Sequence, residues 1–171
     1  MRCPFAVSVR GVRAWRGVND GSDRKWEMAM NVQWDYQLRI YLNDEFAEVA
    51  RQNPDNGALK PLADILNTHR ATMKCQFDAF SDYVGEAERQ GTEKYPLHKW
   101  TKATIEDPAK KAKYLKSFTL YVDGHEVYAK DKADALEADL QPLVGGELIT
   151  RMSKHDTNPA NNPQPPKRYR R

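Results

Sequence analysis

The chain has 171 residues, of which 40% are hydrophobic and 30% are charged. This length accommodates one domain with a hydrophobic core but excludes two full domains, and no apolar run approaches the roughly 18 residues of a membrane span. The formal net charge of +3 is carried by the ends, since residues 1–30 hold 6 Lys/Arg against 3 Asp/Glu and residues 154–171 hold 5 against 1. Residues 31–153 hold 16 against 20, a net charge of −4, so the body has no general attraction for nucleic acid or anionic lipid.

The two cysteines, Cys3 and Cys75, exclude a disulfide framework and a cysteine-based zinc site. Cys75 alternates with Met73 and Phe77, a pattern that predicts a buried free thiol in a strand. A free thiol suits a reducing compartment, so we expect a cytoplasmic protein. The four histidines are scattered along the chain, and we predict neither a metal site nor a cofactor.

Residues 1–30 are interpreted as a flexible basic N-terminal extension. Residues 1–19 contain four arginines and no acidic residue, which also fits an amphipathic, transit-like or membrane-surface segment. Gly11 and Gly17 weaken a helix there, so the extension is the preferred reading.

The first regular element is predicted over residues 34–42, where apolar and polar side chains alternate as in a half-buried strand. Asn43 and Asp44 offer a helix N-cap, and Asn53 with Pro54 ends that helix. A second helical stripe covers residues 59–66, in which Pro61 is tolerated only in the first turn.

A returning strand is predicted over residues 72–77, and Asp78 is predicted to cap the helix that follows it and closes near Gly91. Residues 91–116 are the least regular part of the body, although their aromatic side chains predict that they pack across its surface. Asp107 followed by proline predicts a short helix start within this segment.

A third strand is predicted over residues 118–122. Asp123-Gly124 is a strong hairpin signal, which predicts that residues 125–129 pair back on this strand. Asp131 is predicted to cap the next helix, and residues 148–152 form the last strand. Residues 155–171 are predicted to be a disordered Pro/Asn-rich tail. The basic tip of this tail is a candidate nucleic-acid contact comprising Lys167, Arg168, Arg170 and Arg171.

A strand, helix, strand pattern is written twice, over residues 38–74 and 118–154. The spacings between matching residues agree at 80 for Tyr41 and Tyr121, 81 for Pro61 and Pro142, and 79 for Met73 and Met152. Such a repeat predicts a two-layer α+β sandwich of the ferredoxin-like, split βαβ type over residues 31–154. A helical or irregular insertion is predicted at about 78–116.

Standard catalytic motifs are absent from the sequence: it contains no glycine-rich phosphate loop, no metalloprotease helix and no Gly-x-Ser-x-Gly turn. Asp64, His69 and Arg70 are the most polar local cluster, and at a helix end they are typical of dipole compensation rather than acid–base catalysis. The sequence therefore favours a non-catalytic protein.

The outward-facing positions of the predicted sheet carry tyrosines and cations without an acid among them. Thr72, Thr119 and Ile149 are expected on this face as well. We predict that a partner binds there, through Arg39, Tyr41, Lys74, Tyr121 and Arg151.

Two segments of this face resemble the RNA-recognition-motif family. Residues 40–43, Ile-Tyr-Leu-Asn, resemble its first-strand motif, and residues 116–121, Lys-Ser-Phe-Thr-Leu-Tyr, resemble its third-strand motif. Ser117 departs from the usual glycine, and Leu120 departs from the usual stacking aromatic. The resemblance implies single-stranded RNA binding by the sheet face, while the alternation of the strand predicts that Phe118 and Leu120 face the core.

Three functions are consistent with these patterns. The first is association with another protein, or with a second copy as a homodimer, through the open sheet face. The second is binding of single-stranded RNA or another nucleic acid by the same face, assisted by the basic tail. The third is a small-molecule enzyme with a pocket under residues 91–116. We do not expect a membrane as partner.

Overall fold

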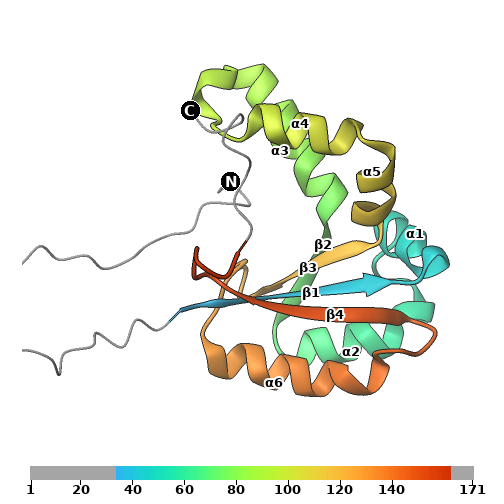
Figure 1. The fold of residues 1–171 in the computed structure, drawn as a ribbon. Coiled ribbons are helices and arrows are strands. Elements are labelled where there is room, and N and C mark those ends of the chain that lie inside the picture. Colours follow the sequence, from blue (N-terminus) through green and yellow to red (C-terminus); the bar gives the residue numbers. More distant parts are fainter. Residues whose placement is uncertain (1–33, 163–171) are drawn as a thin grey trace, which may run out of the picture.

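The computed structural model describes residues 34–162. Its strands form one four-stranded antiparallel sheet in the order β2-β3-β1-β4, which confirms the α+β class (Figure 1). The strands are β1 (Tyr36–Leu42), β2 (Ala71–Cys75), β3 (Ser117–Val122) and β4 (Ile149–Asp156).

The helices cover the two faces of the sheet unequally. Figure 1 shows α2 and α6 beneath the sheet, on what we call the covered face, whereas α3, α4 and α5 rise on the opposite side at one end. We call that opposite side the outer face. The helices are α1 (Asp44–Gln52), α2 (Lys60–Thr68), α3 (Gln76–Gln90), α4 (His98–Glu106), α5 (Pro108–Leu115) and α6 (Lys130–Leu140), with short 3-10 turns at Gly57–Leu59, Thr92–Lys94 and Gln141–Leu143.

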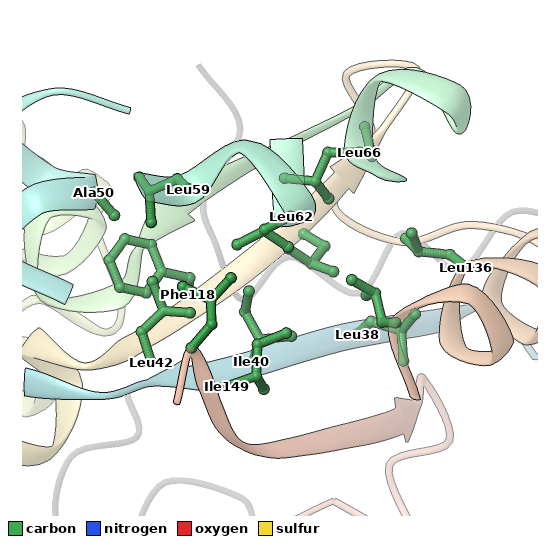
Figure 2. Close-up of a cluster of buried hydrophobic side chains, with 14 of the residues drawn as sticks. Leu38, Ile40, Leu42, Ala50, Leu59, Leu62, Leu66, Phe118, Leu136 and Ile149 are labelled. Carbon is green, nitrogen blue, oxygen red and sulfur yellow. The ribbon is translucent and has the colours of Figure 1, made fainter. Parts of the chain in front are cut away.

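The core lies between the covered face and α1, α2 and α6. Alternate side chains of the strands point toward these helices (Figure 2), and the largest of them are completely or almost completely buried. Burying each such side chain contributes about 1.5–3 kcal/mol, which makes this face the main source of stability. The largest core side chains from the strands are Leu38, Ile40, Leu42, Phe118, Leu120 and Ile149, and those from α2 and α6 include Leu62, Leu136 and Leu140.

The predicted exposure of Ile149 is wrong, because it is completely buried. Ile149 is paired with Leu42, and the register between β1 and β4 shifts between Tyr41 and Leu42. This irregularity changes the alternation of β4, so that Ile149 lies in the core whereas Arg151 lies opposite Tyr41 on the outer face.

The predicted hairpin after β3 is confirmed for its turn and first pair, since Val122 and His125 exchange backbone hydrogen bonds of 3.0 and 2.9 Å. It is wrong beyond His125. Asp123 and Gly124 adopt the left-handed φ angles of 51° and 76°, yet the following chain crosses to β1. There Tyr36 and Tyr128 exchange backbone hydrogen bonds of 2.7 and 2.9 Å, and the Leu38 amide donates to the Tyr128 hydroxyl at 3.0 Å. Tyr128 thus continues the pairing of β1 where β3 ends.

Two of the predicted helix caps are confirmed and two are wrong. The Asn43 side chain accepts from the Asp44 amide, and Asp107 accepts from the amides of residues 109 and 110 at 3.0 and 3.2 Å. Asp78 and Asp131 instead lie in the first turns of α3 and α6 and cap neither helix. Negative charge in a first turn still complements the helix dipole.

Residues 91–116 are more regular than predicted, because α4 and α5 occupy most of them. Aromatic edge-to-face contacts attach them to α3: Phe80 lies 6.3 Å from Trp100 and 5.0 Å from Tyr114, measured between ring centroids. Since α3 begins at Gln76, directly after the last residue of β2, the three helices continue from the sheet without a linker.

The two prolines that support the repeat occupy different places. Pro61 lies in the first turn of α2, as predicted, whereas Pro142 lies in the 3-10 turn after α6. The agreement of their spacing therefore does not reflect equivalent positions. Over residues 34–162, no helix is both long and apolar enough to cross a membrane. The N-terminal extension and the basic tip at Lys167–Arg171 lie outside the described residues.

Candidate functional site

The outer face carries three rows of cross-strand neighbours. The strand register aligns one side chain from each of the four strands in the central row. In one flanking row the register pairs β2 with β3 and β1 with β4. The central row is Lys74, Thr119, Arg39 and Ser153, one flanking row contains the pairs Thr72–Tyr121 and Gln37–His155, and the other contains Ser117, Tyr41 and Arg151.

Arg39 occupies the centre of this face. Its side chain is half-buried, and burial lowers the pKa of its guanidinium below the usual value. The Nε atom donates to Oε1 of Gln37 at 2.7 Å. Arg39 forms no ion pair with any carboxylate of residues 34–162.

Glu126 is an acidic residue on this face that the strand pattern does not predict. The segment that crosses from β3 to β1 carries it there, and its Oε1 accepts from Nε2 of Gln37 at 2.7 Å. Burial raises the pKa of this carboxyl to about 7, against the opposing effects of the Gln37 hydrogen bond and the Arg39 charge. Glu126 is therefore about half protonated near neutral pH.

Tyr41 and Tyr121 both lie on the outer face, although the row of Arg39 and Thr119 separates them. The guanidinium of Arg151 lies 4.0 Å from the centre of the Tyr41 ring, a favourable cation–π geometry. Burial raises the pKa of Tyr121 to about 12, so its hydroxyl stays protonated.

Tyr114 joins this face from α5, outside the strands whose alternation predicts the face. Burial raises its pKa, while the charge of Arg39 acts to lower it. Three tyrosines thus surround one arginine. We call Gln37, Arg39, Tyr41, Tyr114, Tyr121 and Glu126 the Arg39 cluster.

Two further basic side chains border the cluster. Lys74 is held by Asp82 of α3 at 2.7 Å, so it is the least available of the predicted cations. His155 lies opposite Gln37, and its Nε2 is 3.1 Å from the Ser153 hydroxyl. Burial, followed by the charges of Arg39 and Arg151, lowers the pKa of His155, whereas Asp156 acts to raise it.

The chemical character of the two faces is sharply different. Aliphatic side chains of the strands lie on the covered face, and the outer rows carry only polar or aromatic side chains. Phe118 and Leu120, the positions of the third-strand motif, are buried in the core as the alternation predicts. Gln37, Ser153 and His155 follow from the same alternation, but no local signal in the sequence points to Glu126 or Tyr114.

The polar cluster expected at Asp64, His69 and Arg70 is divided among separate polar contacts. Asp64 forms an ion pair with Lys60 at 2.9 Å and Arg70 forms one with Asp123 at 2.8 Å, while Nε2 of His69 lies 2.7 Å from a carboxylate oxygen of Asp139. His69 and Arg70 line an open depression of about 280 Å³ between the end of α2 and the start of α6, away from residues 91–116.

Within residues 34–162, no three His, Cys, Asp or Glu side chains gather in a way that would hold a metal ion. No family model, no curated protein and no solved structure matches this chain. The geometry of the outer face is therefore the basis for a function.

Proposed function

We propose that the protein binds single-stranded nucleic acid, in particular RNA, through the outer face of its sheet. The observation that carries this proposal is the position of Arg39. It is a half-buried cation at the centre of the outer face, next to the buried Gln37 and Thr119, with tyrosines on either side and no carboxylate partner within residues 34–162.

The spacing of the tyrosines suits two bases with a phosphate between them. Tyr41 lies two residues from Arg39 along β1. Thr119 is the partner of Arg39 on β3, and Tyr121 lies two residues from Thr119, on the opposite side of Arg39 from Tyr41. Four strand residues span about 13 Å, which is more than one stacked base requires. Unpaired bases stack on aromatic side chains while cations hold the backbone.

The charge of the face also favours a polyanion. Arg39 and Arg151 lack ion pairs within residues 34–162, while Glu126 is about half neutral near pH 7. The absence of aliphatic side chains from the outer rows disfavours a permanent hydrophobic interface. This local positive surface lies on a body whose net charge is negative.

The test is fluorescence anisotropy with a labelled RNA of mixed sequence, at low and moderate salt. Tyr41→Ala and Tyr121→Ala should each weaken binding by about 5-fold to 100-fold, because each stacked base contributes about 1–3 kcal/mol. Arg151→Ala and removal of Lys167–Arg171 should reduce the salt dependence. Lys60→Ala, an exposed cation of α2 on the other side of the sheet, is the matched control.

Absence of measurable RNA binding at low salt would contradict the proposal. The same holds for binding that the two tyrosine substitutions leave unchanged. Single-stranded DNA of the same sequence, measured in parallel, establishes whether the 2′-hydroxyl contributes.

Association with another protein is the second candidate, because β4 is an edge strand of eight residues. Edge strands present unpaired backbone groups to a further strand, and tyrosine and arginine are typical of interface centres. A homodimer is the simplest case. Light scattering tests it, and a strict monomer with no partner sensitive to Tyr41→Ala or Tyr121→Ala would refute it.

We also infer that the domain is ferredoxin-like, with α3–α5 as an insertion between its halves. The order β2-β3-β1-β4 supports this assignment, because each half then contributes one central and one edge strand joined through a helix on the covered face. An ancient duplication would give the same arrangement. A crystal structure whose strand order differed would refute both statements.

A further inference from the structure

We propose that the Arg39 cluster is a subsite for one phosphodiester anion, and that Glu126 takes up a proton when the anion binds. This inference deepens the proposed function and rests on it for the identity of the natural ligand. It concerns a single anion at a defined arginine, and it is therefore testable without RNA.

Gln37 fixes the orientation of the arginine. Its Oε1 accepts from Arg39 Nε and its Nε2 donates to Glu126, both at 2.7 Å. With Nε engaged, the two terminal amino groups of Arg39 make no hydrogen bond or ion pair within residues 34–162. These groups are the pair of donors that a phosphate requires.

Three hydroxyl groups near this arginine also lack a hydrogen-bonding partner within the described part of the chain. They belong to Tyr41, Tyr114 and Tyr121, and each lies close enough to Arg39 for their charges to interact. Protonated phenols donate hydrogen bonds to anions. The cluster therefore offers several free donors around one fixed positive charge.

Among residues 34–162, Glu126 is the only carboxyl in this hydrogen-bond network, and it has no direct hydrogen bond to Arg39. Gln37 stands between Glu126 and Arg39, so an incoming anion does not have to break an ion pair. An ionised Glu126 would nevertheless repel that anion, whereas a protonated Glu126 would not. Since the Glu126 pKa is about 7, the two states exchange near neutral pH.

The groups that face Glu126 determine the sign of this effect. Arg39 and the Gln37 amide favour its ionised form, and burial favours its neutral form. A bound anion neutralises Arg39 and adds repulsion, so both changes favour protonation. Anion binding therefore weakens as the pH rises through 7.

His155 acts in a separate range of pH. Arg39 and Arg151 disfavour its cationic form, and Asp156 favours it, so it is neutral at pH 7 and above. A bound anion would favour the cation, which strengthens binding only in more acidic solution. His155→Gln separates this contribution from that of Glu126.

The depression that His69 and Arg70 line differs from the Arg39 cluster in the pairing of its cations. Its two cations, Arg70 and Lys132, both pair with Asp123, at 2.8 and 2.7 Å. An anion there would compete with a carboxylate that is already in place. The Arg39 cluster has no such direct competitor within residues 34–162.

The experiment is an NMR titration of the full chain with dimethyl phosphate, a diester that stays a monoanion throughout the range used. We expect shifts at the Arg39 side chain and a dissociation constant about tenfold larger at pH 8 than at pH 6, because only the protonated fraction of Glu126 is competent. Glu126→Gln should bind with equal affinity at pH 7 and pH 8, and the double variant Glu126→Gln with His155→Gln should bind equally at pH 6 and pH 8. Arg39→Gln should not bind at either pH.

Two controls keep the result interpretable. Glu147→Gln removes one exposed carboxylate elsewhere and should retain the tenfold difference between pH 6 and pH 8. His155→Gln should retain the roughly fivefold difference that Glu126 alone gives between pH 7 and pH 8. Circular dichroism establishes that each variant is folded. Equal affinity of the wild type at pH 6 and pH 8, or shifts that do not involve Arg39, would overturn the inference.

The outcomes for the subsite and for RNA binding are distinct. RNA binding that depends on Tyr41 but has the same affinity at pH 6 and pH 8 supports the proposed function and refutes the proton-coupled subsite. Dimethyl phosphate binding with the expected pH dependence, without RNA binding, supports the subsite and refutes the proposed function.

Discussion

Glu126→Gln should make the protein more stable at alkaline pH. The gain in the free energy of unfolding depends on how far the folded protein raises the pKa of Glu126. The Glu126 pKa is raised from 4.5 to about 7 in the folded protein. The folded state therefore binds a proton that the unfolded state releases between these values. Wild-type stability is full below pH 4.5 and falls as the pH rises toward 7.

The magnitude follows from the size of the shift. One pKa unit corresponds to about 1.36 kcal/mol, which gives an upper limit of about 3.4 kcal/mol above pH 7. The limit is reduced because the carboxyl retains some exposure to solvent. Glutamine keeps the carbonyl oxygen that accepts from Gln37 and does not ionise. The free energy of unfolding of the variant should therefore exceed that of the wild type by an amount that grows between pH 5 and pH 8, by about 2.5 kcal/mol at most.

Urea denaturation at pH 5, 6, 7 and 8, followed by circular dichroism, measures this difference. With a slope of about 1–3 kcal/mol per molar urea for a small protein, the midpoint of the variant should move upward by about 1–2 M relative to the wild type across this range. Glu147→Gln corrects for the loss of one negative charge. A difference between Glu126→Gln and wild type that is the same at every pH would refute the reasoning.

Three further substitutions test the fold by urea denaturation. Tyr128→Phe removes the hydroxyl that accepts from the Leu38 amide and should destabilise the protein by about 1–3 kcal/mol; an unchanged midpoint would mean that water replaces the hydroxyl. Asp107→Ala removes the cap of α5 and should lower stability by about 1 kcal/mol, whereas Asp107→Asn should retain most of it. Phe118→Ala opens a cavity in the core and should destabilise by about 3–5 kcal/mol, which a loss below 1 kcal/mol would contradict.

The sequence was sufficient to predict the elements that depend on local patterns. Alternation located β1 and β3, and cap chemistry located the starts of α1 and α5, because these signals lie within a few residues of each other. Asp123-Gly124 correctly predicted a turn, but the strand with which the following residues pair depends on which strand still has unpaired backbone groups. The amide of Tyr36 on β1 supplies such a group, and the turn residues carry no information about it.

The candidate site was predictable only where it follows a strand. Arg39, Tyr41, Tyr121 and Arg151 share the outer face because the alternation dictates it. Glu126 reaches the face through the crossing segment and Tyr114 through α5, and both depend on tertiary packing. The exposure of Ile149 was mispredicted because a shift of register is not visible in the hydrophobic pattern of one strand.

The strand order also has a consequence for synthesis on the ribosome. β1 and β2 are not neighbours, because β3 lies between them. As the chain emerges, neither strand has its native partner until β3 follows α3–α5, so the backbone edges of β1 and β2 stay unpaired while these helices are translated. Such late, non-local pairing slows folding and exposes nascent chains to aggregation. A chaperone that holds residues 34–116 during translation would improve the yield of folded protein more than one that acts on the completed chain.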